Sequence, residues 1–187
     1  MTAATAHFPA TTAASVPRWV DLAAHTVPWT AVPSAIWRIA LGLGVPVGFS
    51  GELAELYRAP GWITPHVVVL SLVAEGLALL TLGLVKPWGE VVPGWVPVLA
   101  GRRIPVAAAV IPAGFGAIAV TWITVSSAFL WASPLNNGDP DAPHGLAEVV
   151  MVACYAPLLA WGPLLAVVTV AYAVRRSRRP AGSNRLS

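Results

Sequence analysis

The sequence predicts an all-α membrane protein with four transmembrane helices and both termini in the cytoplasm. Three observations lead to this fold class. The chain of 187 residues is 57% hydrophobic and only 10% charged, and its mean hydropathy is +0.72. Soluble domains carry about 25% charged residues, and a chain this short could not bury so much apolar surface in a soluble core. The apolar residues also form four long tracts, and the connections between these tracts alternate in the sign of their charge.

The four tracts predict spans at residues 32–50, 64–85, 105–131 and 147–174. A helix needs roughly 20 residues to cross the hydrocarbon core. The first tract is interrupted by Arg38 and Pro46, and the second by Glu75 alone, whereas the third has no charge. The fourth contains Pro157 and Pro163, which predict kinks because proline removes a backbone donor and clashes with the preceding turn.

The flanking segments complete one transmembrane domain over residues 31–174. Residues 1–30 are rich in Ala, Thr and Pro, which predicts a tail that is disordered or lies at the membrane interface. Residues 175–187 are strongly basic and predict a cytoplasmic tail.

The charges predict the orientation in the membrane. The connection between the second and third spans holds Lys86, Arg102 and Arg103 against a single acid, and the C-terminal tail is rich in arginine. The other two connections are net acidic. Because short cytoplasmic loops are enriched in Lys and Arg, four spans place both basic segments inside. Three spans would put them on opposite faces and fit worse.

Two charges inside the spans predict an intramembrane polar pair. Glu75 lies near the middle of the second tract, where an isolated anion would be costly. With the first span at residues 32–50, Arg38 lies ~9 Å and Glu75 ~15 Å from the inner end. An arginine side chain can bridge such a difference, so we expect an Arg38–Glu75 ion pair between neighbouring antiparallel helices.

Three interpretations of this pair stay open at the level of sequence. It lines a polar cavity for a proton, an ion or a small ligand, or it is an interhelical clamp that fixes helix register. In the third interpretation Arg38 extends to the inner headgroups while Glu75 is protonated.

A second, weaker cluster is expected at the outer face. Asp141, His144 and Glu148 share one helical face if the fourth helix starts early, and His66 begins the second span on the same side. Histidine with carboxylates can bind a divalent metal, but no HExxH or CxxC motif is present. A solvated acidic face with helix caps is the alternative.

The inner loop carries a resemblance to known sequences. Residues 85–105, VKPWGEVVPGWVPVLAGRRIP, follow EGLALLTLGL, and the loop has the form PWGxxxPxWxPxxxGRRxP. It resembles a set of small, uncharacterised four-span membrane proteins of high-GC Gram-positive (actinobacterial) type. The resemblance covers about residues 70–112, and the chain departs from it at Gly94 and Ala100. It implies a plasma-membrane location and a four-helix fold, and it carries over no catalytic residue. The anchors expected in this loop are Trp88, Trp95, Arg102 and Arg103.

The function expected from these features is that of a non-enzymatic membrane subunit or accessory protein. Its expected partners are the lipid bilayer and other membrane subunits or further copies of the chain; neither a cofactor nor nucleic acid is expected. One alternative is a component of a small proton- or ion-coupled transporter, which requires Glu75 to face a wet cavity. Another is a haem, quinone or metal protein that uses the outer-face histidines, which requires His66 and His144 to converge on one pocket.

Overall fold

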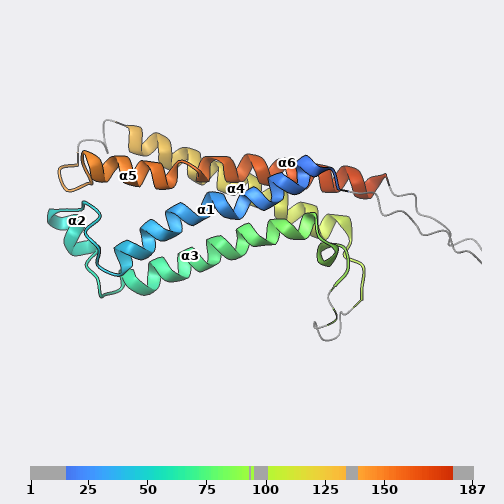
Figure 1. Cartoon of the computed structure of the whole chain (residues 1–187), viewed down its shortest axis with the longest axis horizontal. Coiled ribbons are helices and arrows are strands. Elements are labelled where there is room, and N and C mark those ends of the chain that lie inside the picture. Colours follow the sequence, from blue (N-terminus) through green and yellow to red (C-terminus); the bar gives the residue numbers. More distant parts are fainter. Residues whose placement is uncertain (1–15, 93, 95–100, 134–138, 179–187) are drawn as a thin grey trace, which may run out of the picture.

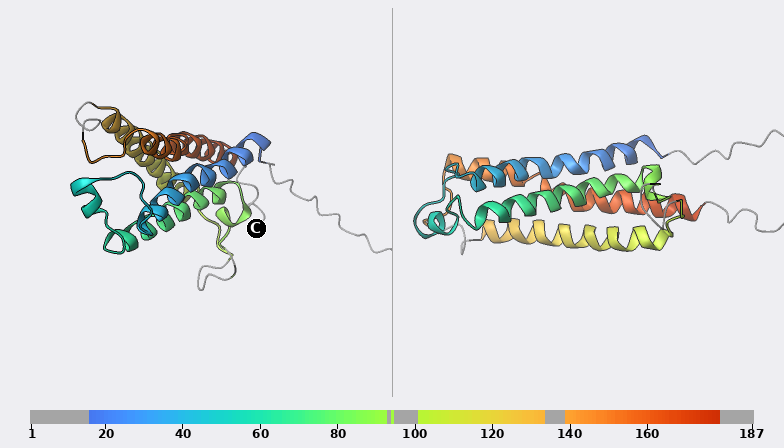
Figure 2. Two further views of the ribbon diagram at one scale, coloured as in Figure 1. Left: turned by 60° about the vertical axis from the view of Figure 1, so that its left-hand side comes forward. Right: turned by 90° about the horizontal axis from the view of Figure 1, so that it is seen from below.

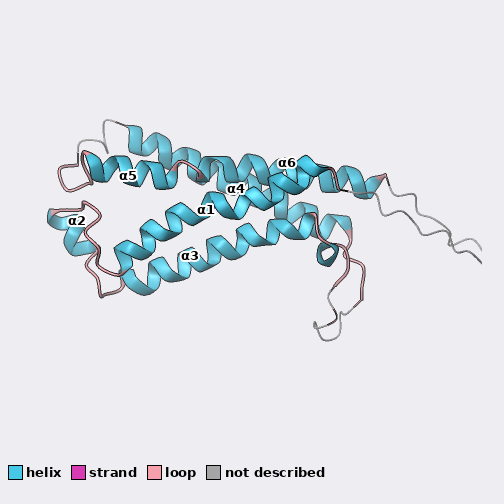
Figure 3. Cartoon of the chain, viewed as in Figure 1, coloured by secondary structure: helices cyan, strands magenta, loops and turns pink. Residues whose placement is uncertain are grey.

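The computed structural model describes residues 16–92, 94, 101–133 and 139–178, and in these ranges its regular elements are helices. The long helices are α1 (Arg18–Gly42), α3 (Ile63–Leu80), α4 (Val106–Ala132) and α6 (Leu158–Ser177). Shorter elements are α2 (Gly51–Leu56), α5 (Leu146–Tyr155) and the 3₁₀ turns η1 (Thr81–Leu84) and η2 (Pro87–Gly89). Figure 3 shows how helices dominate the chain.

The long helices form one elongated bundle in which the chain runs up and down in turn (Figures 1 and 2). Helix α1 packs against α3, α5 and α6, while α4 packs mainly against α6. The first described residues, η1, the start of α4 and the end of α6 therefore share one end of the bundle. The opposite end carries α2 and the starts of α3 and α5.

Three helical stretches are long and apolar enough to cross a membrane among the described residues. They are Ile63–Leu84, Val106–Ala132 and Leu146–Ser177, of 22, 27 and 32 residues. They coincide closely with the predicted tracts at 64–85, 105–131 and 147–174. The last stretch is interrupted between α5 and α6 at Ala156 and Pro157, where a proline kink is expected.

Helix α1 differs from the predicted first span at residues 32–50. It begins at Arg18 and ends at Gly42, so residues 18–30, expected in the tail, are helical; the rest of that tail, apart from residues 16 and 17, lies outside the described residues. Pro28 and Pro33 lie inside this helix without ending it. The helix stops where Gly44 and Gly48 adopt φ of +83° and +101°, a left-handed conformation that glycine adopts readily.

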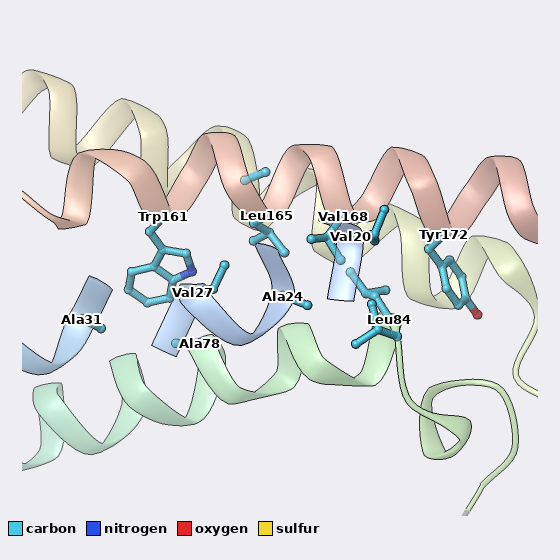
Figure 4. Close-up of a cluster of buried hydrophobic side chains, with 12 residues drawn as sticks. Val20, Ala24, Val27, Ala31, Ala78, Leu84, Trp161, Leu165, Val168 and Tyr172 are labelled. Atoms are coloured by element: carbon cyan, nitrogen blue, oxygen red, sulfur yellow. The ribbon is translucent and has the colours of Figure 1, made fainter. Parts of the chain in front are cut away.

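The main core lies where α1, α3, α4 and α6 meet (Figure 4). Trp161, Leu165, Val168 and Tyr172 of α6 point toward α1 and α3. Small residues such as Ala24 and Ala31 of α1 and Ala78 of α3 are fully buried, which lets the backbones approach closely. A second cluster, centred on Trp37, Leu41, Ile63, Val67 and Met151, fills the other half of the bundle.

The two ends of the bundle carry opposite charge. We call one the arginine end, because it gathers Arg18, Lys86, Arg102, Arg103, Arg175, Arg176 and Arg178. Contacts across it confirm the grouping: Lys86 lies 3.9 Å from Asp21 of α1, and Arg176 donates a 2.8 Å hydrogen bond to the Ile104 carbonyl. The other is the acidic end, with Glu52, Glu55, Asp139, Asp141 and Glu148. The two basic segments predicted to share a face thus lie together.

Candidate functional site

The polar site inside the bundle is built around Arg38 of α1. Its side chain is buried, with 9% of the residue exposed, and its Nε donates a 3.1 Å hydrogen bond to Ser71 Oγ of α3. The guanidinium carbon also lies 6.0 Å from the ring centroid of Tyr155, at the end of α5. A buried guanidinium requires such acceptors and π faces, because its desolvation is otherwise uncompensated. Arg38 therefore joins three helices at one point.

Glu75 lies one helical turn after Ser71 on the same face of α3, but it does not pair directly with Arg38. The described residues show no nitrogen of Arg38 within 4.0 Å of the Glu75 carboxylate. Instead, Glu75 Oε1 is buried and has no hydrogen-bond partner. The expected ion pair is thus replaced by the Arg38–Ser71 bond, with Glu75 close by.

The boundaries of α1 explain this difference. The expected depth of Arg38 assumed a helix that begins near Val32, whereas α1 begins at Arg18. Arg38 then lies only four residues before Gly42, near the acidic end, and meets Ser71 rather than Glu75. This position also excludes the interpretation in which Arg38 extends to headgroups at the arginine end, about 30 Å away at 1.5 Å per residue.

Several other hydroxyl groups of the long helices bond to their own helices. Thr30 and Ser34 of α1 donate to the carbonyls of Val27 and Ala31, at 2.7 and 2.8 Å. Thr121 and Thr169 do the same in α4 and α6. These hydroxyl groups are satisfied locally, so they do not compete for Arg38 or Glu75.

The expected outer-face cluster of His66, Asp141, His144 and Glu148 does not form a metal site. The described residues contain no group of three His, Cys, Asp or Glu side chains that could hold a metal ion. His66 instead packs on the Trp62 ring, with centroids 5.3 Å apart.

Asp141 has a structural role in place of the expected ligand role. Its Oδ2 accepts a 2.8 Å hydrogen bond from the backbone N–H of Glu52, and its carbonyl accepts one of 2.9 Å from the Ser50 N–H. Asp141 therefore caps α2 from the connection between α4 and α5. Gly51 (φ +47°) sits against the Asp141 carboxylate, where a Cβ would overlap it.

A second polar site, which the sequence analysis missed, lies at the arginine end. The Glu90 carboxylate accepts from Arg175 at 3.2 Å and from Arg176 at 3.3 Å, and these three side chains are only 18%, 10% and 13% exposed. Arg175 also donates to the Leu84 carbonyl at 3.0 Å. The Tyr172 ring lies beside both guanidiniums. We call this group the Glu90 clamp. Residues 175 and 176, expected at the start of the basic tail, are helical, since α6 continues to Ser177.

The sequence contains one indication of this clamp, an isolated acidic residue. Glu90 is the only acidic residue between Glu75 and Asp139, in a loop that is otherwise basic. Its arginine partners are 85 and 86 positions away, a separation that no local pattern indicates.

The inner loop itself is ordered where it is described. Val91 and Arg103 form an antiparallel bridge, and the Ile104 N–H donates to the Glu90 carbonyl at 2.9 Å. The Trp88 ring lies directly on Gly83, where a Cβ would overlap it. Arg102 and Arg103 are exposed at the arginine end, and Trp95 lies outside the described residues. Trp88 is thus the one expected aromatic anchor whose contact is defined.

Comparisons with family models, with curated proteins and with solved structures gave no match.

Proposed function

We propose that the chain is an integral protein of the plasma membrane that crosses the bilayer four times, with α1 as the fourth span. The observation that carries this is the position of α1. It runs the length of the bundle and packs with one face against α3, α5 and α6. Its buried Thr30, Ser34 and Arg38 would be costly toward lipid but are shielded here. A span tolerates polar residues on the face that packs against other helices.

The same proposal places the arginine end in the cytoplasm. Exposed Arg18, Arg102, Arg103 and Arg178 gather there, and Lys and Arg enrichment is typical of cytoplasmic loops. Both termini then lie inside, which agrees with the plasma-membrane location implied by the inner-loop resemblance.

Cysteine labelling in intact cells tests this topology. In a Cys154→Ala background, we expect Glu52→Cys to react with a membrane-impermeant maleimide from outside. Arg18→Cys and Arg102→Cys should react only after permeabilisation. Labelling of Arg18→Cys and Glu52→Cys from the same side would show that α1 does not cross and would overturn the four-span proposal.

Within this topology, we propose that the protein acts as a non-enzymatic subunit or accessory protein. The support is the use of its buried charges: Arg38 holds α1, α3 and α5 together, and Glu90 holds the inner loop on α6. Helix α4 meanwhile exposes a row of large apolar residues, including Phe115 and Trp122, to lipid or to partner helices. A bundle whose core is held by polar contacts and whose α4 exposes apolar side chains can associate with other helices in the membrane through α4.

Mass measurement tests the subunit role. Cross-linking in native membranes followed by purification should give an assembly larger than the 19.4 kDa monomer. A substitution in the α4 face, Phe115→Ala, should weaken it, whereas Leu72→Ala on the exposed face of α3 is the matched control. A monomer both in membranes and in nanodiscs would count against this role.

One observation favours a second candidate, a component of a proton- or ion-coupled transporter. Glu75 Oε1 is buried at mid-span without a hydrogen-bond partner, while Arg38 is occupied by Ser71. A carboxylate in this situation can bind a proton or a cation. Under this candidate, Glu75→Gln folds normally but removes a carboxyl band that changes with pH in infrared difference spectra. An unchanged spectrum would exclude it.

A further inference from the structure

An apolar groove opens on the side of the bundle near the arginine end. It lies between the first turn of α1 and the second half of α6, which run side by side there (Figure 1). Its volume is about 680 Å³. The lining residues are Pro17, Trp19, Val20, Ala166, Val167, Val170, Ala171, Val174, Arg175 and Arg178. All but the two arginines are apolar.

The apolar part of the groove is shaped for a hydrocarbon chain. Trp19 and Val170 are 60% and 62% exposed and form its edges, whereas Val20 is buried. Ala166 and Ala171 contribute little side-chain volume, which leaves the hollow between the larger residues. In the proposed membrane placement, this hollow opens toward lipid and runs along α6.

The charged part lies at one end of the groove. Arg175 and Arg178 are three residues apart and so share a face of α6. Arg175 is held in place by the Leu84 carbonyl and by Glu90. Arg178 is exposed, and no ion pair links it to the described residues. Because Glu90 is shared by two arginines, the local charge stays positive.

We propose that this groove is a binding site for one anionic phospholipid. An acyl chain lies along Val167, Val170 and Val174, and the phosphate meets Arg178 at the headgroup level of the inner leaflet. The charge argues for this occupant over the chain's own residues 1–15, which contain no acidic side chain. It also argues for an anionic over a zwitterionic lipid, since each basic residue near the membrane surface favours anionic lipid. The proposal rests on the proposed membrane placement of the arginine end.

Native mass spectrometry of the full chain in non-ionic detergent tests the site. The probe is an equal mixture of dioleoyl phosphatidylglycerol and dioleoyl phosphatidylcholine. We expect the wild type to retain phosphatidylglycerol preferentially, and Arg178→Gln to lower that retention about fivefold. Val170→Trp, which fills the groove, should lower retention of both lipids. The matched control is Arg58→Gln, an exposed arginine at the acidic end, which should retain lipid as the wild type does.

Each outcome decides the proposal. Equal retention of the two lipids, or wild-type retention by Arg178→Gln, would overturn it. Displacement by excess inorganic phosphate would show a phosphate site rather than a lipid site and would also overturn it. Circular dichroism and thermal unfolding confirm that each variant is folded. Because lipid retention is measured in detergent, its failure is distinguishable from a failure of the topology, which cysteine labelling reports separately.

Discussion

Arg38 Nε of α1 donates a 3.1 Å hydrogen bond to Ser71 Oγ of α3, and both residues are buried. This bond joins α1, which has several buried polar residues, to α3, whose composition is more apolar. It therefore links the two helices at a defined register. In the low-dielectric interior, loss of a single acceptor for a charged donor is expensive.

Ser71→Ala should therefore lower the free energy of unfolding by about 1–3 kcal/mol, since a buried guanidinium loses its acceptor. Reversible unfolding in mixed detergent micelles, or the thermal midpoint, measures the change. Ser127→Ala is the control, because Ser127 is exposed on α4. Equal effects of the two substitutions would show that the Arg38–Ser71 bond contributes nothing specific.

The Glu90 clamp gives a second prediction. Glu90→Gln should leave Arg175 and Arg176 partly buried without their counter-ion and destabilise the arginine end by about 2 kcal/mol. The inner loop should then become more accessible to trypsin at Arg102 and Arg103. The rate of cleavage and the thermal midpoint measure the effect.

A matched control for the clamp lies at the acidic end. Glu55 and Arg58 form a 2.7 Å ion pair, but their side chains are 66% and 71% exposed. Solvent screening makes such pairs weak, so Glu55→Gln should leave both readouts unchanged. If Glu90→Gln behaves in the same way, the clamp is only a surface ion pair.

Much of the bundle could be predicted because a long apolar tract indicates a helix whose exposed surface is apolar, as in a membrane. The helices at residues 63–84 and 106–132 are exposed over most of their surface and lie almost where composition places them. The interruption at Pro157 follows from the missing backbone donor. The grouping of Lys86 with Arg175 at one end follows from the alternation of charge along the chain.

Helix α1 shows where this kind of prediction fails. Because one face of it packs against other helices, it tolerates Thr30, Ser34 and Arg38 there, and its composition between Arg18 and Val32 does not resemble a span. Because α1 begins earlier than predicted, the expected depth of Arg38 differs from the observed one, and Arg38 contacts Ser71 instead of Glu75. The clamp on Glu90 was missed for a different reason, since its partners are distant in sequence and only the packing of α6 against the loop brings them together.

The cap on α2 provides a third prediction. Asp141→Ala should remove the acceptor of the Glu52 N–H and cost about 1 kcal/mol locally. Hydrogen exchange at the Glu52 amide should accelerate, with little change at α3. Glu148→Ala is the control, because it alters the charge of the same end without touching α2. Binding of Zn²⁺ that is lost in Asp141→Ala would instead support the expected metal site.

The contact between α4 and α6 gives the last prediction. Gly162 of α6 lies so close to Thr121 of α4 that a Cβ would overlap its hydroxyl oxygen and approach the Ala117 carbonyl. Gly162→Ala should therefore push the two helices apart and destabilise the bundle by about 1–3 kcal/mol. Gly114→Ala in α4 is the control: no atom lies near its Cβ position, so the change should be neutral or slightly stabilising. Thermal unfolding of both variants decides the question, because equal stability would mean that α4 does not depend on this close approach to stay on the bundle.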